Sequence, residues 1–148
     1  MQCALELRFS GTRADFERAF GQLRGALDSV QLDAAPRYSV ELVFEEIVAN
    51  IVRHGAPDAR KSELHVHVTL ELGLELMRLT FEDDGVAFDP RARPDPPPPQ
   101  SLDYRGGFGL LLVRHAASSL DYQRLADGRN RLTVVLPRTA VSTNARAV

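Results

Sequence analysis

Hydrophobic and polar residues alternate at the start of the chain and then follow a helical repeat. Residues 4–9 alternate as a half-buried strand requires. From Thr12 onward, phenylalanine and leucine recur every three or four residues, which predicts an amphipathic helix over 12–30. Thr12 is the expected N-cap of this helix, and Asp15 is placed to complete a capping box.

The following segments predict a helix and then a pair of strands. An apolar stripe indicates a helix from Pro36 to His54, which a glycine and a proline then end. Alternation over 63–72 and 74–81 predicts two strands joined as a hairpin at Gly73.

A proline-rich stretch separates these elements from the last part of the chain. Residues 89–106 hold six of the nine prolines, which excludes a helix or an inner strand there. A linker between two domains is the simplest interpretation, but too few residues follow for a second core, so we predict a stiff lid within one domain. Beyond it, the pattern predicts a buried helix over 108–120, strands near 121–125 and 131–136, and a frayed tail over about 138–148.

This order of elements predicts an α+β two-layer sandwich. The sheet should be mixed and mostly antiparallel, with helices covering one of its faces. A length of 148 residues favours a single domain over 1–148. Hydrophobic residues at 44% and charged residues at 26% are typical of globular proteins, which excludes disordered and fibrous classes.

Charge and cysteine content narrow the function classes further. The net charge of −2 leaves no basic excess for binding nucleic-acid phosphates. The lone Cys3 has no partner for an internal disulfide, and no stretch is apolar enough for a membrane span or a signal peptide. We therefore expect a cytoplasmic protein with neither nucleic acid nor membrane as a partner.

Two segments carry side chains suited to chemistry. Glu46 and Asn50 lie one turn apart on the second helix, where the amide oxygen can bind a hard cation and the carboxylate can take a proton. A solvated helix flank is the commoner explanation of such a pair. Asp83 and Gly85 lie at the end of a predicted strand. The Asp83 carboxylate can accept hydrogen bonds from an exocyclic amine of a ligand. Alternatively, the two residues form a simple turn with no ligand.

The third segment is the glycine-rich start of the last helix. Free backbone N–H groups at a helix N-terminus favour phosphate oxygens, and an arginine can clamp a terminal phosphate. A hinge into a buried helix is the alternative. The residues concerned are Arg105, Gly106, Gly107, Phe108 and Gly109.

Taken in order, the three segments resemble a known set of motifs. E-x-x-x-N-x-x-x-H-G (46–55), D-x-G-x-x-F-D-P (83–90) and R-G-G-x-G-L (105–110) resemble the N, G1 and G2 boxes of the GHKL, or Bergerat-fold, ATPases. The resemblance covers about residues 4–137. The small size and the HG and FDP sequences resemble most closely the anti-sigma-factor serine/threonine kinases, the RsbW-like group.

The resemblance implies ATP and Mg²⁺ as cofactors and a role for each matching residue. Asn50 would bind Mg²⁺, and Glu46 would be the catalytic general base. Arg105 would touch the γ-phosphate as a second catalytic residue. Asp83 would bind the adenine amino group, with Gly85 beside the ring. The remaining cofactor-binding residues would form the phosphate cradle: Gly106, Gly107, Phe108 and Gly109.

Two positions depart from the family pattern. Ala87 replaces the usual second glycine of D-x-G-x-G, which we expect to weaken nucleotide affinity by crowding. Asn130 stands where the family often has a threonine that supports the adenine-binding aspartate, and we expect its amide to take over that role in cofactor binding.

The resemblance also implies a function and partners. We expect a kinase that phosphorylates a STAS-type anti-sigma antagonist and sequesters a regulatory partner such as a sigma factor. The alternative is a nucleotide-gated module that switches partners without phosphoryl transfer. A histidine-kinase fragment is disfavoured, because its phosphoacceptor helix would need room upstream. A homodimer through the first strand and helix is expected, where Gly21 and Gly25 permit close approach.

Overall fold

The structure is a computed structural model that describes residues 1–92 and 108–139. Its elements follow the predicted order, with two short 3₁₀ helices added. They are β1 (Gln2–Ser10), α1 (Arg13–Asp28), α2 (Ala34–Gly55), η1 (Asp58–Glu63), β2 (His65–Leu72), β3 (Leu76–Asp83), η2 (Pro90–Ala92), α3 (Phe108–Ala116), β4 (Ser119–Arg124) and β5 (Asn130–Pro137).

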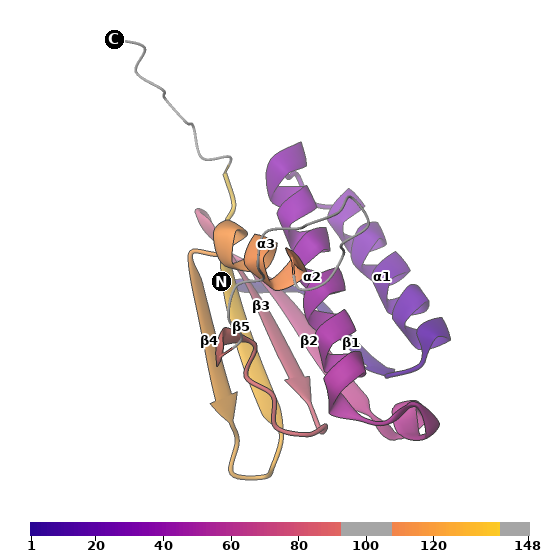
Figure 1. Ribbon diagram of the computed structural model, residues 1–148. Helices are drawn as coiled ribbons and strands as arrows, with labels where there is room; N and C mark the ends of the chain where they lie inside the picture. The colour runs from indigo at the N-terminus through magenta and orange to yellow at the C-terminus, as the bar shows by residue number, and fades with distance from the viewer. Residues whose placement is uncertain (93–107, 140–148) are drawn as a thin grey trace, which may run out of the picture.

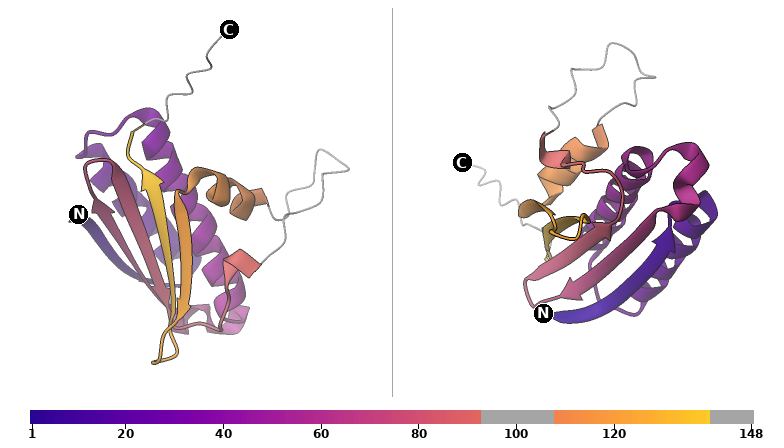
Figure 2. Two further views of the ribbon diagram at one scale, coloured as in Figure 1. Left: turned by 90° about the vertical axis from the view of Figure 1, so that its left-hand side faces the viewer. Right: turned by 90° about the horizontal axis from the view of Figure 1, so that it is seen from below.

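The five strands form one sheet in the order β1-β2-β3-β5-β4 (Figure 2). Each of the four strand pairs is antiparallel, so the sheet is antiparallel throughout rather than mixed. β3 is the central strand, whereas β1 and β4 lie at the edges. The register places Asp83 at the end of β3 directly opposite Asn130 at the start of β5.

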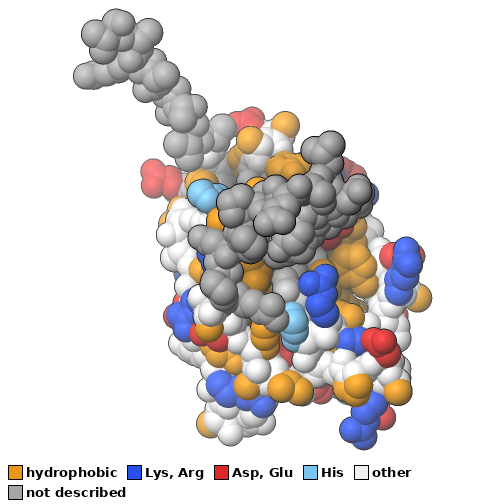
Figure 3. All heavy atoms as spheres, viewed as in Figure 1, with side chains coloured by type: hydrophobic (Ala, Val, Ile, Leu, Met, Phe, Trp, Pro, Cys, Tyr) orange, Lys and Arg blue, Asp and Glu red, His pale blue; other side chains and the backbone are white. Residues whose placement is uncertain are grey.

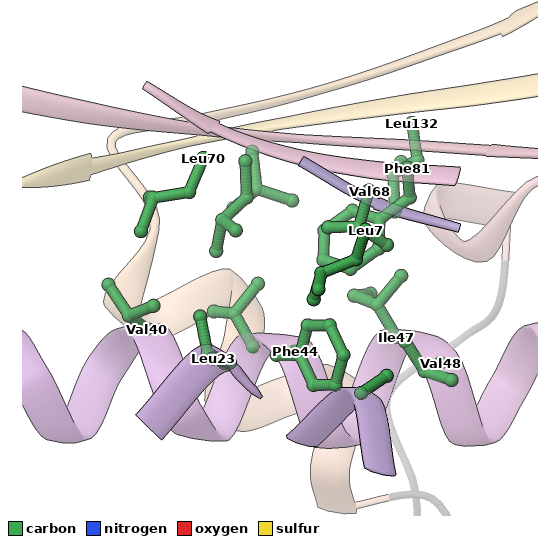
Figure 4. Packing of buried hydrophobic residues seen from close by; sticks show 14 of the residues in the cluster. Leu7, Leu23, Val40, Phe44, Ile47, Val48, Val68, Leu70, Phe81 and Leu132 are labelled. Carbon is green, nitrogen blue, oxygen red and sulfur yellow. The ribbon is translucent and has the colours of Figure 1, made fainter. Parts of the chain in front are cut away.

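The helices lie on one face of the sheet, which confirms the predicted two-layer α+β class (Figure 1). Alternate residues of the inner strands point toward α2, as the burial of every second residue in β5 shows. Phe44 of α2 lies at the centre of this layer, with Phe81 of β3 facing it at 6.4 Å between ring centroids (Figure 4). The described residues thus share one hydrophobic core between sheet and helices.

The start of α1 confirms one part of the expected cap and corrects the other. Thr12 accepts a hydrogen bond from the backbone N–H of Asp15, as an N-cap should. The Asp15 carboxylate does not return to Thr12. Its Oδ2 accepts instead from the backbone N–H and hydroxyl of Ser10, at 3.0 and 2.7 Å. The capping box is therefore replaced by a tie from α1 back to the end of β1.

Several element boundaries differ from those predicted. The hairpin strand predicted over 74–81 runs from Leu76 to Asp83, because residues 73–75 form the turn. The helix predicted over 108–120 ends at Ala116, since Ser119 and Leu120 pair with β5. Sheet pairing at these positions overrides a helical pattern that continues in the sequence.

The segment after α2 adds the 3₁₀ helix η1, which the sequence pattern does not predict. Lys61 in η1 donates hydrogen bonds to the carbonyls of Val52 and Ala56, which lie at the C-terminal end of α2. The backbone N–H of Gly11 in turn donates to the carbonyls of Lys61 and Leu64. η1 therefore ties the end of α2 to the turn between β1 and α1.

The surface of the described part mixes charges of both signs. On the helix-bearing face, acidic and basic side chains lie near one another among hydrophobic ones (Figure 3). None of the helices described in residues 1–92 and 108–139 has the length and hydropathy of a membrane span. Arg138, in the predicted tail, is held by backbone and side-chain hydrogen bonds to the carbonyls of Glu75 and Gly73, and residues 140–148 lie outside the described part.

Candidate functional site

The helix α2 places Glu46 and Asn50 beside each other, as the helical period predicts. Both are half-buried at the border of a stripe that packs against the sheet. The Asn50 amide Nδ2 donates to the backbone carbonyl of Glu46 at 2.7 Å. This bond orients the amide, and its Oδ1 accepts no hydrogen bond from the described residues. Asn50 therefore offers one oxygen ligand to a cation.

Glu46 has the electrostatics of a proton acceptor. Burial raises the pKa of its carboxyl above the ordinary value, and the neighbouring charge of Glu45 raises it further. The guanidinium of Arg53 acts in the opposite direction. A raised pKa makes the carboxylate a stronger base than an exposed glutamate.

The first turn of α3 packs directly against this carboxylate. A Cβ atom built on Gly109 would overlap the Glu46 carboxylate group, whereas glycine leaves room for it. The glycine-rich segment and the second helix, 63 residues apart, thus meet at Glu46. Phe108 and Gly109 are described, but Arg105, Gly106 and Gly107 lie outside the described residues, so their expected positions stay predictions.

Asp83 is a buried carboxylate whose two oxygens differ in their bonding. Only 5% of the residue is exposed. Its Oδ1 accepts from the backbone N–H of Gly85 at 2.9 Å and from Nδ2 of Asn130 at 3.0 Å. Its Oδ2 accepts no hydrogen bond from the described residues. Burial raises the pKa of Asp83, and the bonds from Asn130 and Gly85 oppose that rise.

Asn130 occupies the supporting position that the sequence assigned to it. Besides Asp83, its Nδ2 donates to the carbonyl of Val86 at 3.0 Å. Its Oδ1 accepts from the hydroxyl of Tyr122 at 2.5 Å and from the guanidinium of Arg124 at 3.1 Å. Sequence reasoning missed Tyr122 and Arg124, whose only signal is alternation along the edge strand β4.

Gly85 is required by a close approach of two backbones. A Cβ on Gly85 would lie 2.7 Å from the Cα of Gly55 and 2.9 Å from its carbonyl oxygen. Val86 N also donates to the Gly55 carbonyl at 3.1 Å, which holds the loop against the end of α2. Ala87 is exposed in this loop, and no described residue other than glycine has a positive φ, so its alanine imposes no backbone strain.

Two small cavities lie next to Asp83. Each is about 20 Å³, enough for about one water molecule. Both are lined by Ile51, Asp83, Phe88 and Asn130, and Asn50 lines one of them. The ring of Phe88 stacks on that of His54 at 4.2 Å between centroids. Each cavity is too small for an aromatic base, and the Phe88 ring lines both of them.

The start of the predicted lid is anchored to the last helix and to β4. Arg91 pairs with Asp89 at 3.0 Å and with Asp121 at 3.5 Å. Arg114 of α3 donates to the carbonyl of Pro90 at 2.9 Å. η2 thus forms a short turn where the sequence predicts no helix, while residues 93–107 of the lid lie outside the described part.

Comparison with known proteins identifies a family and a relative with a similar sequence. The model of the family described as the histidine kinase-like ATPase domain matches residues 9–136. The serine/threonine-protein kinase BtrW of Bordetella bronchiseptica is 37% identical over 100 residues, which cover 66% of this chain and 68% of that protein.

Solved structures share the fold at low sequence identity. The RsbU and RsbW domains of Rv1364c from Mycobacterium tuberculosis align with a TM-score of 0.62 at 20% identity. That alignment covers 92% of this chain and 32% of the longer one. The SiaB-SiaC complex from Pseudomonas aeruginosa aligns with a TM-score of 0.57 at 15% identity, over 92% of this chain and 91% of the other.

Proposed function

The chain belongs to the histidine kinase-like ATPase domain family, which confirms the resemblance in its motifs, and we propose that it is an ATP-dependent serine/threonine protein kinase. The proposal rests on one arrangement: Glu46, with its raised pKa, lies one turn from the oriented amide of Asn50 and against Gly109 of the glycine-rich segment. The name of the relative BtrW, a serine/threonine-protein kinase, supports the same activity.

The donor set of the described residues fits Mg²⁺ and ATP. Oδ2 of the buried Asp83 is left to accept from an amino group on a base. Oδ1 of Asn50 would supply one oxygen to Mg²⁺, which in proteins keeps several waters and shares ligands with substrate phosphates. Phe108 and Gly109 begin α3, and Gly109 lies against the Glu46 carboxylate. Backbone N–H groups in this first turn would be available to phosphate oxygens.

Glu46 would act on the hydroxyl group of the protein substrate. When bound, Mg-ATP supplies the phosphoryl group and part of the charge that stabilises its transfer. Glu46 would accept the hydroxyl proton as the hydroxyl oxygen bonds to the γ-phosphorus, while the bond to the departing ADP oxygen breaks. Arg105 is proposed to hold the γ-phosphate, with Gly106 and Gly107 lining the cradle.

We further propose a STAS-type antagonist as the phosphorylated protein and a sigma factor or similar regulator as the sequestered one. Both follow from the resemblance to anti-sigma-factor kinases. The structurally similar SiaB is known as a complex with SiaC, so this fold does bind a second protein in that case. A homodimer through β1 and α1 is also proposed, and light scattering that shows a monomer at micromolar concentration would exclude it.

Calorimetric titration tests the nucleotide site. ATP and ADP should bind in the presence of Mg²⁺, and Asp83→Asn should abolish binding because the amide presents a donor in place of an acceptor. Asp84→Asn is the matched control, since the adjacent Asp84 is exposed and pairs with His65. Asn50→Ala should remove the Mg²⁺ dependence. Absence of binding at millimolar nucleotide would refute the proposal.

Phosphoryl transfer separates the kinase from a nucleotide-gated binding module. With radiolabelled ATP and individual STAS-domain proteins as substrates, Glu46→Ala should abolish labelling and keep ATP binding. Glu63→Ala, at an exposed glutamate that pairs with Arg60 in η1, should label like the wild type. Labelling retained in Glu46→Ala would refute the assigned base. A stable unlabelled complex with wild-type protein would favour the module.

A further inference from the structure

The side-chain amide of Asn130 has all its hydrogen-bonding capacity in use. Its Oδ1 accepts two bonds, from the Tyr122 hydroxyl and the Arg124 guanidinium. Its two Nδ2 hydrogens point to Oδ1 of Asp83 and to the Val86 carbonyl, both at 3.0 Å, and the Gly85 carbonyl lies farther away at 3.5 Å. An amide has two acceptor positions and two donor hydrogens, so each is matched. Asn130 is only 4% exposed, and water cannot replace a lost partner easily.

This arrangement allows only one orientation of the amide. A flipped amide would place Oδ1 of Asn130 against Oδ1 of Asp83 and the Val86 carbonyl, which are both acceptors. It would also place Nδ2 against Arg124, which can only donate. Tyr122 and Arg124 bind Oδ1 of Asn130 and therefore determine that its Nδ2, and not its Oδ1, contacts Asp83.

The orientation of Asn130 sets the hydrogen-bonding character of Asp83. With Gly85 N and Asn130 Nδ2 both donating to Oδ1, the carboxylate keeps Oδ2 as an acceptor. Asp83 and Asn130 line both small cavities, and Tyr122 lines one of them. A ligand binds more tightly here if its edge carries a hydrogen-bond donor toward Oδ2 of Asp83. An acceptor at the same position would face the carboxylate oxygen and weaken binding.

We propose that Tyr122 is a positioning residue that, together with Arg124, fixes the orientation of the Asn130 amide. The site then selects a purine with an amino group at position 6 over a purine with a carbonyl there. This inference rests on the proposed nucleotide-binding function. It assigns the discrimination to β4, a strand that carries none of the three sequence motifs.

The test compares the affinities of ATP and inosine triphosphate, which differ in the group at position 6 and the proton at the adjacent ring nitrogen. Calorimetry with Mg²⁺ should show that wild-type protein prefers ATP by at least about tenfold. Tyr122→Phe should lower that ratio about fivefold, the equivalent of about 1 kcal/mol at 25 °C. Tyr38→Phe, at an exposed tyrosine on α2, is the matched control and should leave the ratio unchanged.

The ratio of the two affinities distinguishes a role of Tyr122 in positioning Asn130 from a general loss of structure. Tyr122→Phe that weakens both nucleotides equally would overturn the inference and leave the proposed function standing. Equal binding of the two nucleotides by wild-type protein would do the same. Wild-type protein that binds neither would overturn both. The double variant Tyr122→Phe/Arg124→Met should bring the ratio close to one.

A measurement without nucleotide tests the positioning directly. In ¹⁵N–¹H spectra of the free protein, the side-chain amide protons of Asn130 should exchange slowly with solvent, since both are hydrogen-bonded and buried. Their exchange should quicken several-fold in Tyr122→Phe and stay unchanged in Tyr38→Phe. Unchanged exchange in Tyr122→Phe would overturn the inference whatever the nucleotide affinities are.

Discussion

Replacing Gly85 by alanine should destabilise the fold at the contact between α2 and the loop after β3. The new Cβ would lie 2.7 Å from the Cα of Gly55, against an ordinary minimum of 3.4 Å, so the two backbones must separate by about 0.7 Å. The Cα and the carbonyl oxygen of Gly55 are backbone atoms and cannot rotate away, and the Cβ would also lie 2.9 Å from Oδ1 of Asp83. Overpacking of this kind costs about 1–3 kcal/mol. The hydrogen bond from Val86 N to the Gly55 carbonyl would weaken as well, for about 1 kcal/mol more.

The expected loss is therefore about 2–4 kcal/mol of unfolding free energy, or about 4–16 °C in Tm for a chain of this size. Urea unfolding followed by circular dichroism measures it. Gly25→Ala is the control, because a Cβ added there would meet no atom within 4 Å and a helical glycine-to-alanine change stabilises by about 0.5–1 kcal/mol. A loss below about 0.5 kcal/mol in Gly85→Ala would refute the reasoning.

Substitutions at Gly109, Glu82 and Lys61 test three other contacts. Gly109→Ala should change the unfolding free energy by less than about 1 kcal/mol, because only the flexible Glu46 carboxylate must move. It should nevertheless lower the rate of phosphoryl transfer at least about tenfold, because that carboxylate is displaced. Labelling at the wild-type rate would contradict this. Burial acts to raise the pKa of Glu82, but the hydrogen bond and charge of Arg131, with the charges of Arg129 and His67, outweigh it, so the pKa lies below its ordinary 4.5. That stabilisation is present above 4.5 and is lost as pH falls through the lowered pKa. Glu82→Gln should therefore be less stable than wild type by about 1 kcal/mol at pH 7, and the difference should shrink as pH falls below 4.5 in urea titrations. Lys61→Met should cost about 1 kcal/mol by removing the donor to the last carbonyls of α2, and an unchanged thermal midpoint would count against that contact.

The site shows which contacts a sequence can predict. Glu46 and Asn50 are four residues apart on a helix, and the helical period alone places them side by side. The pairing of Asp83 with Asn130 spans 47 residues and was expected only through the family resemblance. Tyr122 and Arg124 join that pair through the register of β4 on β5, which no local pattern specifies.

The boundaries of the elements were less predictable than their order. The apolar stretch after Gly109 continues a helical pattern past Ala116, but pairing of the following residues with β5 decides in favour of a strand. The need for glycine at position 85 was expected from a turn beside the base. That expectation stays a prediction, and the structure adds a second cause, the backbone of Gly55, 30 residues earlier, which no spacing rule relates to it.

The edge position of β4 bears on how such a protein can diversify. β4 is six residues long and pairs with one neighbour only, so its outer side contributes no interstrand bonds within the described sheet. Substitutions there leave the central strand and its core contacts intact, so they cost less folding free energy than changes in β3, which would damage the centre of the sheet. A chain that carries its selectivity on β4 can drift toward another ligand through a few edge substitutions while the rest of its architecture stays intact.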